Sequence, residues 1–161
     1  MNILKYPNPI LKQKCNPVQK MGKKFRESIH DMIELLHSTR GLGLSAPQVG
    51  IDEQFFVWNY YPSVVVNPTI TRRKGNIGSE EGCLSLIYDN EKEVPVELYK
   101  WAKVDKSGRV HIIREVQRPE EIWVEGYDYK GREFNLRYKG LPAIIFSHEY
   151  QHILGKLIID N

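Results

Sequence analysis

The sequence predicts an α+β fold in which antiparallel β-sheets pack around a C-terminal helix, with an amphipathic helix near the N-terminus. Three observations predict it. Residues 18–39 carry apolar side chains at close to helical spacing, residues 94–138 alternate apolar and polar side chains, and residues 141–154 begin with a strongly apolar run. Strands in the middle with helices at both ends favour antiparallel sheet over a repeating βαβ arrangement.

The first half of the chain is expected to contain one helix and a few short strands. Residues 1–17 are punctuated by proline and should run irregularly over the surface. The helix should end at Gly41, because the run of glycine and proline in residues 41–48 cannot continue it. The elements expected after it are strands at 54–58 and 63–66 and a Gly-rich, polar loop at 75–82.

Two hairpins are predicted in the second half. One joins residues 94–104 to 108–116 around Lys106-Ser107-Gly108, and the other joins 121–128 to 132–138 around Tyr129-Lys130-Gly131. The last helix can hold Pro142 in its first turn, where the missing N–H costs nothing, and Gly155 is suited to end it.

The bulk properties indicate one ordinary globular domain, residues 1–161. The chain is 41% hydrophobic and 27% charged, with a net charge of +3. Its basic residues are scattered, which argues against direct binding of nucleic acid. No stretch is long and apolar enough for a membrane span or an export signal, and two cysteines are too few for a disulfide scaffold. We therefore expect a cytoplasmic protein with no membrane partner.

The string His148-Glu149-Tyr150-Gln151-His152 predicts a metal site. On a helix, His148 and His152 project from the same face one turn apart, so their ring nitrogens can converge on one divalent ion. Glu149 can reach a water beside that ion and take its proton. The alternative is that these are two ordinary histidines. Burial after an apolar run would, however, penalise three titratable groups unless something satisfied them.

A catalytic site of this kind needs a third protein ligand. One large class places a histidine six residues after the second one, but Ile158 stands there. Asp160 is the only acid after His152, so the third ligand is expected upstream. A lone cysteine is usually a small core residue, but Cys83 becomes a candidate here because thiolate is a good ligand for iron(II) or zinc.

Three motifs in order resemble the peptide deformylase family. They are Gly41-Leu42-Gly43-Leu44-Ser45-Ala46-Pro47-Gln48, then Glu81-Gly82-Cys83-Leu84-Ser85, then the His148–His152 string. The resemblance covers most of residues 1–86 and 112–160. It implies removal of the formyl group from the N-terminal methionine of newly made polypeptides, with possible proximity to the ribosome exit.

The resemblance also implies a role for each matching residue. Cys83, His148 and His152 would hold one divalent metal, with iron(II) favoured in the cell and zinc, nickel or cobalt compatible with the same ligands. Glu149 would be the general base, and Gln48 with the Leu84 backbone N–H would hold the reacting carbonyl oxygen. The residues expected to bind substrate are Leu42, Gly43, Leu44, Gly82, Leu141, Ile144 and Ile145.

The chain departs from the family pattern in three places. Ser45 stands where the family usually has alanine, and Gln151 replaces the usual aspartate, which keeps a hydrogen bond but loses a charge. The 65 positions from Cys83 to His148 exceed the family norm, which suggests an inserted hairpin at about residues 87–110. Arg114 and Arg118 are both candidates for the family's substrate-binding arginine.

Two other functions are consistent with these motifs. One is a related metal-dependent amidase with another N-acyl substrate, because the inserted segment could reshape the cleft. The other is a deformylase-like fold kept as a binding module. The second is disfavoured because Cys83, His148, Glu149 and His152 are all present.

Overall fold

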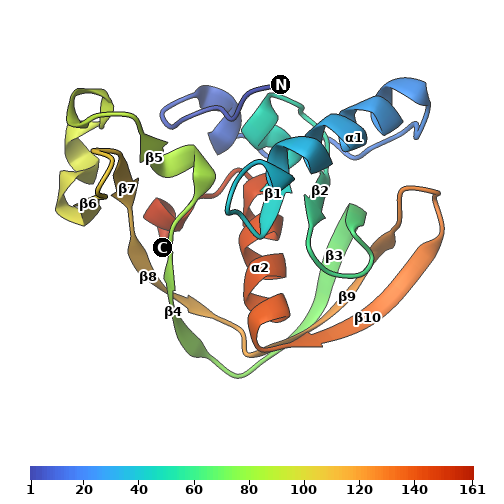
Figure 1. The fold of residues 1–161 in the computed structure, drawn as a ribbon. Coiled ribbons are helices and arrows are strands. Elements are labelled where there is room, and N and C mark those ends of the chain that lie inside the picture. The colour runs from blue at the N-terminus through green and yellow to red at the C-terminus, as the bar shows by residue number, and fades with distance from the viewer.

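The computed structural model describes all 161 residues (Figure 1). It has two α-helices, α1 (Lys23–His37) and α2 (Leu141–Ile153), and several short 3-10 helices. The strands are β1 (Gly43–Ser45), β2 (Phe55–Trp58), β3 (Val64–Lys74), β4 (Ile77–Glu81), β5 (Ile87–Tyr88), β6 (Ala102–Val104), β7 (Val110–Ile112), β8 (Arg114–Arg118), β9 (Glu121–Tyr127) and β10 (Glu133–Lys139). Neither α-helix is long and apolar enough to cross a membrane.

The largest sheet has five antiparallel strands in the order β1-β2-β3-β9-β10. The predicted α+β class, with antiparallel strands between two helices, is confirmed. So is the hairpin of β9 and β10, whose turn is held by Asp128: its carboxylate accepts from the backbone N–H groups of Lys130 and Arg132. Gly131 has φ +76°, a conformation that glycine adopts without strain.

Helix α1 covers one face of this sheet. Its buried side chains Phe25, Ile29, Met32 and Leu36 follow the helical period and pack against β1, β2 and β3. The prediction placed this helix at residues 18–39, so the centre is right and the first residues are not helical. Gly22 precedes the first turn in an extended conformation.

Helix α2 lies on the other face and is the centre of the molecule. Figure 1 shows it between the five-stranded sheet and the ribbon of β4 and β8. Ala143, Ile145 and Phe146 pack with residues of β2, β3 and β9. Pro142 stands in the first turn and Gly155 follows the helix at φ +74°, as the sequence predicts. The helix is buried nearly all round, so polar groups on it require partners.

Residues 77–81 form strand β4 and not the loop predicted for residues 75–82. The strand pairs with β8 from Ile77 opposite Arg118 to Glu81 opposite Arg114. None of its five residues is fully buried, so the strand has no apolar alternation. It is held by backbone hydrogen bonds in a two-stranded ribbon, which composition does not reveal.

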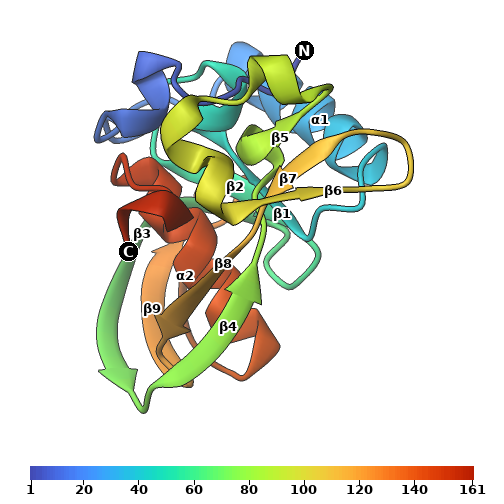
Figure 2. The same ribbon diagram turned by 90° about the vertical axis from the view of Figure 1, so that its left-hand side faces the viewer.

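The segment after β4 folds into a small three-stranded sheet of order β5-β7-β6 (Figure 2). The predicted turn at Lys106-Ser107-Gly108 is present, between β6 and β7. The first predicted strand is wrong in part, because residues 96–101 form a 3-10 helix. Val96 and Leu98 would share one face of a strand, but Leu98 is buried while Val96 is 76% exposed, because the chain turns as a helix there.

Candidate active site

The two histidines of α2 and Cys83 bring three metal-binding atoms together. His148 Nε2 lies 3.2 Å from His152 Nε2, and Cys83 Sγ lies 3.3 Å from His152 Nε2. The donor atoms of all three residues lie within 4.8 Å of one another. The spacing of one helical turn aims both rings at the same point, and Cys83 enters from the loop that follows β4.

This donor set fits a divalent metal. One thiol and two imidazoles are suitable ligands for iron(II), zinc, cobalt or nickel. Burial lowers the pKa of His152 well below its ordinary value, so the ring is neutral and can offer a lone pair. Its Nδ1 is buried without a hydrogen-bond partner, and Nε2 is the nitrogen that faces Cys83 and His148.

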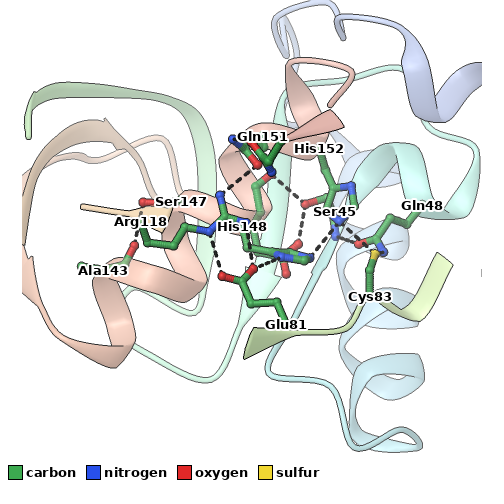
Figure 3. Close-up of polar contacts among 12 residues, drawn as sticks. Ser45, Gln48, Glu81, Cys83, Arg118, Ala143, Ser147, His148, Gln151 and His152 are labelled. Carbon is green, nitrogen blue, oxygen red and sulfur yellow. Dashed lines mark hydrogen bonds and ion pairs between the residues drawn. The ribbon is translucent and has the colours of Figure 1, made fainter. Parts of the chain in front are cut away.

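The Glu81–Arg118 ion pair contacts the Nδ1 side of the His148 ring (Figure 3). Nδ1 of His148 lies 2.8 Å from Oε1 of Glu81, and Arg118 donates to both oxygens of that carboxylate. The Oε1 atom of Gln151 accepts a further hydrogen bond of 2.8 Å from Arg118 Nη1. Gln151 thus keeps a hydrogen bond at the position where the family usually has aspartate. The contact with Glu81 fixes which nitrogen of His148 faces the centre.

Glu149 is buried beside the two histidines, with 4% of its surface exposed. The Ser45 hydroxyl donates to Glu149 Oε2 at 2.6 Å and also lies 3.1 Å from the Glu149 backbone carbonyl. Burial raises the pKa of the Glu149 carboxyl, although His148 and the Ser45 hydroxyl oppose that rise. A Cβ at Gly43 would lie 2.6 Å from Glu149 Oε1, so this position has no room for a side chain.

Gln48 is also buried and its amide has a defined orientation. Oε1 accepts a hydrogen bond of 2.9 Å from the Ser45 backbone N–H. Nε2 then points at the Cys83 loop, 3.5 Å from Cys83 Sγ and 3.2 Å from Ser85 Oγ. The amide therefore presents donors to the same centre that the metal ligands face.

These residues lie at one side of a cleft of about 400 Å³. Eleven of the thirteen residues proposed from the sequence line it, and His152 and Leu44 do not. Those in the lining include Leu42, Gly43, Gln48, Gly82, Cys83, Leu84, Leu141, Ile144, Ile145, His148 and Glu149.

Leu44 is a correction to the proposed substrate-binding set. Its side chain is fully buried in the core under α1 and does not line the cleft. Side chains alternate across a strand, so the Leu44 side chain points away from the face on which Gly43 borders the cleft.

Neither candidate arginine lines the cleft. Arg118 is occupied by Glu81 and Gln151, and the Arg114 guanidinium stacks on Trp101 at 4.2 Å. Sequence reasoning missed the structural role of Glu81 and Arg118, because a pair 37 residues apart leaves no local pattern. The one available signal was that Glu81 stands two residues before Cys83.

Comparison with known proteins gives a family for this arrangement. The family described as polypeptide deformylase matches residues 1–109 and 109–161. The chain belongs to this family. It is 32% identical over 167 residues to peptide deformylase of Karelsulcia muelleri, covering 99% of this chain and 76% of that protein. It is 32% identical over 168 residues to the enzyme of Neisseria meningitidis, covering all of this chain and 86% of that one.

Solved structures agree with this assignment. Peptide deformylase from Thermotoga maritima superposes with a TM-score of 0.80 at 31% identity, covering 99% of this chain and 95% of that one. The enzyme from Legionella pneumophila gives the same TM-score at 29% identity, covering 99% and 83%. The chain is therefore a metal-dependent hydrolase that removes the formyl group from the N-terminal methionine of formylated polypeptides.

Proposed function

We propose that deformylation takes place at the centre formed by Cys83, His148 and His152, with Glu149 as general base and Gln48 and the Leu84 backbone N–H as oxyanion donors. The convergence of three ligand atoms within 4.8 Å of one another carries this proposal. A divalent metal bound there supplies Lewis acidity, which acidifies water and withdraws charge from an amide carbonyl. The thiolate and two imidazoles would hold it, and we propose iron(II) as the metal used in the cell.

Glu149 is placed to move the proton. Its Oε2 atom is held by the Ser45 hydroxyl, which leaves Oε1 toward the cleft edge at Gly43. Oε1 takes a proton from the attacking water and later returns it to the amine of methionine, so that formate leaves. Burial of the carboxyl makes it a stronger base than an exposed glutamate, which suits both transfers.

Gln48 and Leu84 act on the carbonyl oxygen. Attack on the formamide places negative charge on that oxygen, and N–H groups already aimed at it lower the energy of the transition state. Gln48 Nε2 is oriented by the contact of its Oε1 atom with Ser45, so little reorganisation is required. The Leu84 N–H follows Cys83 directly in the chain and therefore stays with the metal ligand.

The methionine side chain has an apolar place beside this centre. Leu42 and Leu141 are half exposed at the cleft edge, while Ile145 is buried. These side chains would cover a thioether side chain without offering a charge, which favours methionine over polar residues. Gly43 and Gly82 leave backbone room for an extended peptide to pass between them.

The substrates are formylated nascent chains, and we propose that the enzyme meets them in the cytoplasm near the ribosome exit. The deciding experiment uses protein prepared without oxygen and loaded with iron(II). It compares turnover of formyl-Met-Ala-Ser with that of acetyl-Met-Ala-Ser. We expect turnover of the formyl peptide and little of the acetyl one. Equal turnover of both would contradict the assigned specificity for formyl.

A further inference from the structure

The cleft has a catalytic end, at Gly43, and a distal end, at Gly41. A Cβ at Gly43 would meet Glu149, whereas a Cβ at Gly41 would lie 2.9 Å from Leu84 Cδ1. Beyond Gly43 the strand is closed, because Ser45 is fully buried under α2. A peptide with its formyl carbon at the metal centre must therefore lead its later residues toward Gly41.

The distal end is built from two segments that lie far apart in the sequence. Arg40 lines it just before Gly41, and Ile87, His111 and Ile112 line it from β5 and β7. Leu42 and Gly43, at the start of β1, line the same cleft as these residues of β5 and β7. The segment after Cys83 thus contributes a wall to the cleft, and the residues that follow methionine in a substrate would contact this wall.

Arg40 is the basic residue of the cleft lining, apart from the histidines, and it has no ion pair. Glu80 is paired with Lys103, and Glu81 with Arg118. Arg40 makes neither a salt bridge nor a side-chain hydrogen bond and is exposed. An unpaired guanidinium presents up to five donors, and a carboxylate is the side chain that matches them best.

The His111 side chain, unlike that of Arg40, is held by a partner. Its Nε2 lies 2.8 Å from Asp105 Oδ2. The other Asp105 oxygen, Oδ1, accepts from the hydroxyl and backbone N–H of Ser107 and from the Arg109 N–H, so the turn itself holds Asp105. His111 also stands opposite Lys103 in the β6–β7 register. The imidazole is thereby held as a rigid polar group on the cleft wall.

We propose that Arg40 and His111 form a subsite for an acidic side chain at the second or third residue of the formylated substrate. This rests on the function proposed above and extends it to residues beyond methionine. Arg40 supplies the charge that selects a carboxylate, and His111, held by Asp105 through Nε2, supplies a ring edge against which that side chain packs. Because Arg40 is exposed, the effect should be modest and should weaken as salt is added.

The test compares formyl-Met-Ala-Glu-amide, formyl-Met-Ala-Lys-amide and formyl-Met-Ala-Ser-amide with the iron-loaded enzyme at low salt. The amide removes the terminal carboxylate, which would otherwise bind in place of a side chain. We expect kcat/KM to be roughly five-fold higher for Glu than for Lys, mainly through KM, as for exposed charge pairs. Equal values for Glu and Lys would overturn the subsite.

Variants of the two subsite residues test whether they cause the preference for an acidic substrate side chain. Arg40→Gln should abolish the preference for Glu over Lys, whereas Arg40→Lys should keep part of that preference. His111→Asn should raise KM for the Glu peptide with metal content unchanged. Arg109→Gln is the matched control, because Arg109 is exposed on the same hairpin, pairs with Asp89 and does not line the cleft. Retention of the preference in Arg40→Gln would also refute the proposal.

A failure of the proposed subsite can be told apart from a failure of the proposed function. Loss of turnover on all three peptides would count against the proposed function and not against the subsite. Binding of the product peptides Met-Ala-Glu-amide and Met-Ala-Lys-amide, followed through the ring signals of His111 by NMR, gives the same comparison without turnover. Tighter binding of the Glu peptide, lost in Arg40→Gln, is expected, and equal binding would overturn the subsite.

Discussion

Arg118 and Glu81 form a two-pronged ion pair inside the protein: Nε and Nη2 of the guanidinium donate to the two carboxylate oxygens at 2.8 and 2.7 Å. The Arg118 side chain is 2% exposed and that of Glu81 is 9% exposed. Burial raises the pKa of Glu81, but the hydrogen bonds from Arg118 and His148 outweigh it and hold that pKa at about 2. The orientation of a proposed metal ligand thus depends on a pair that joins β4 to β8.

Arg118→Met is expected to destabilise the fold strongly. It leaves a buried carboxylate without its cation, which typically costs about 3–5 kcal/mol. The free energy of unfolding in urea measures this loss. Arg114→Met is the matched control from the same strand, because it removes an arginine that stacks on Trp101 and is partly exposed. Its cost is expected to be about 1 kcal/mol. Similar losses of unfolding free energy in both variants would show that the buried pair contributes no more to stability than the stacked Arg114.

Cys83→Ala is expected to lose bound metal, because two imidazoles alone make a weak site. Metal content per chain, measured after desalting, checks this. Cys15→Ala is the control: that thiol is also buried, but it lies outside the cluster of His148 and His152. An unchanged metal content in Cys83→Ala would remove the cysteine from the ligand set.

Glu149→Gln is expected to keep the metal and lose turnover. Glutamine is close in shape and cannot accept the proton, and such groups typically contribute on the order of 10²–10⁴-fold. Rates of formyl-Met-Ala-Ser hydrolysis at equal metal loading measure the effect. Glu125→Gln, an exposed change on the outer face of β9, should behave as the native chain does. Normal turnover in a metal-loaded Glu149→Gln protein would contradict the role of the base.

Gln48→Ala should lower kcat by roughly 10²–10³-fold, the usual effect of removing one oxyanion donor. The side chain also braces the Ser45 backbone N–H, so thermal unfolding must be followed in parallel. Gln48→Glu keeps an acceptor for that N–H but replaces the donor amide, and it should be as slow as the alanine variant. Full activity in Gln48→Glu would exclude the amide from the reaction.

Stability should fall at alkaline pH, partly through Cys15. Burial, and then the neighbouring Asp52, raise the pKa of this thiol to about 12 in the folded chain. The unfolded chain releases that proton from about pH 9, its ordinary value. The folded state therefore loses about 1.4 kcal/mol per pH unit between these values. Urea unfolding from pH 8.5 to 10.5 tests this, and Cys15→Ala should show a shallower fall; an identical slope would count against it.

The sequence predicted what local spacing determines. The positions of His148 and His152 on one helix face follow from one turn of α2, and the turn at Lys130-Gly131 follows from its residue types. Strand β4 was missed because it has no buried face, and its pairing with β8 is decided by distant backbone groups.

The remaining differences have the same origin. Val96 and Leu98 were assigned to one face of a strand because apolar and polar residues alternate there, but residues 96–101 form a 3-10 helix in which only Leu98 of the two is buried. The Glu81–Arg118 pair was missed because no local sequence pattern around either residue indicates a partner 37 positions away. Leu44 was placed in the cleft from the motif, and only the pleat of β1 shows that it points into the core.

The lack of room for a side chain at Gly43 limits which substitutions can make this enzyme resistant to an inhibitor. A small molecule that packs against the Gly43 backbone touches a position where any added carbon would lie 2.6 Å from Glu149 Oε1. A resistance substitution there would exclude the compound only by displacing the proposed base. Resistance should therefore arise at exposed cleft residues such as Leu42 or Leu141, whose side chains can change without moving Glu149.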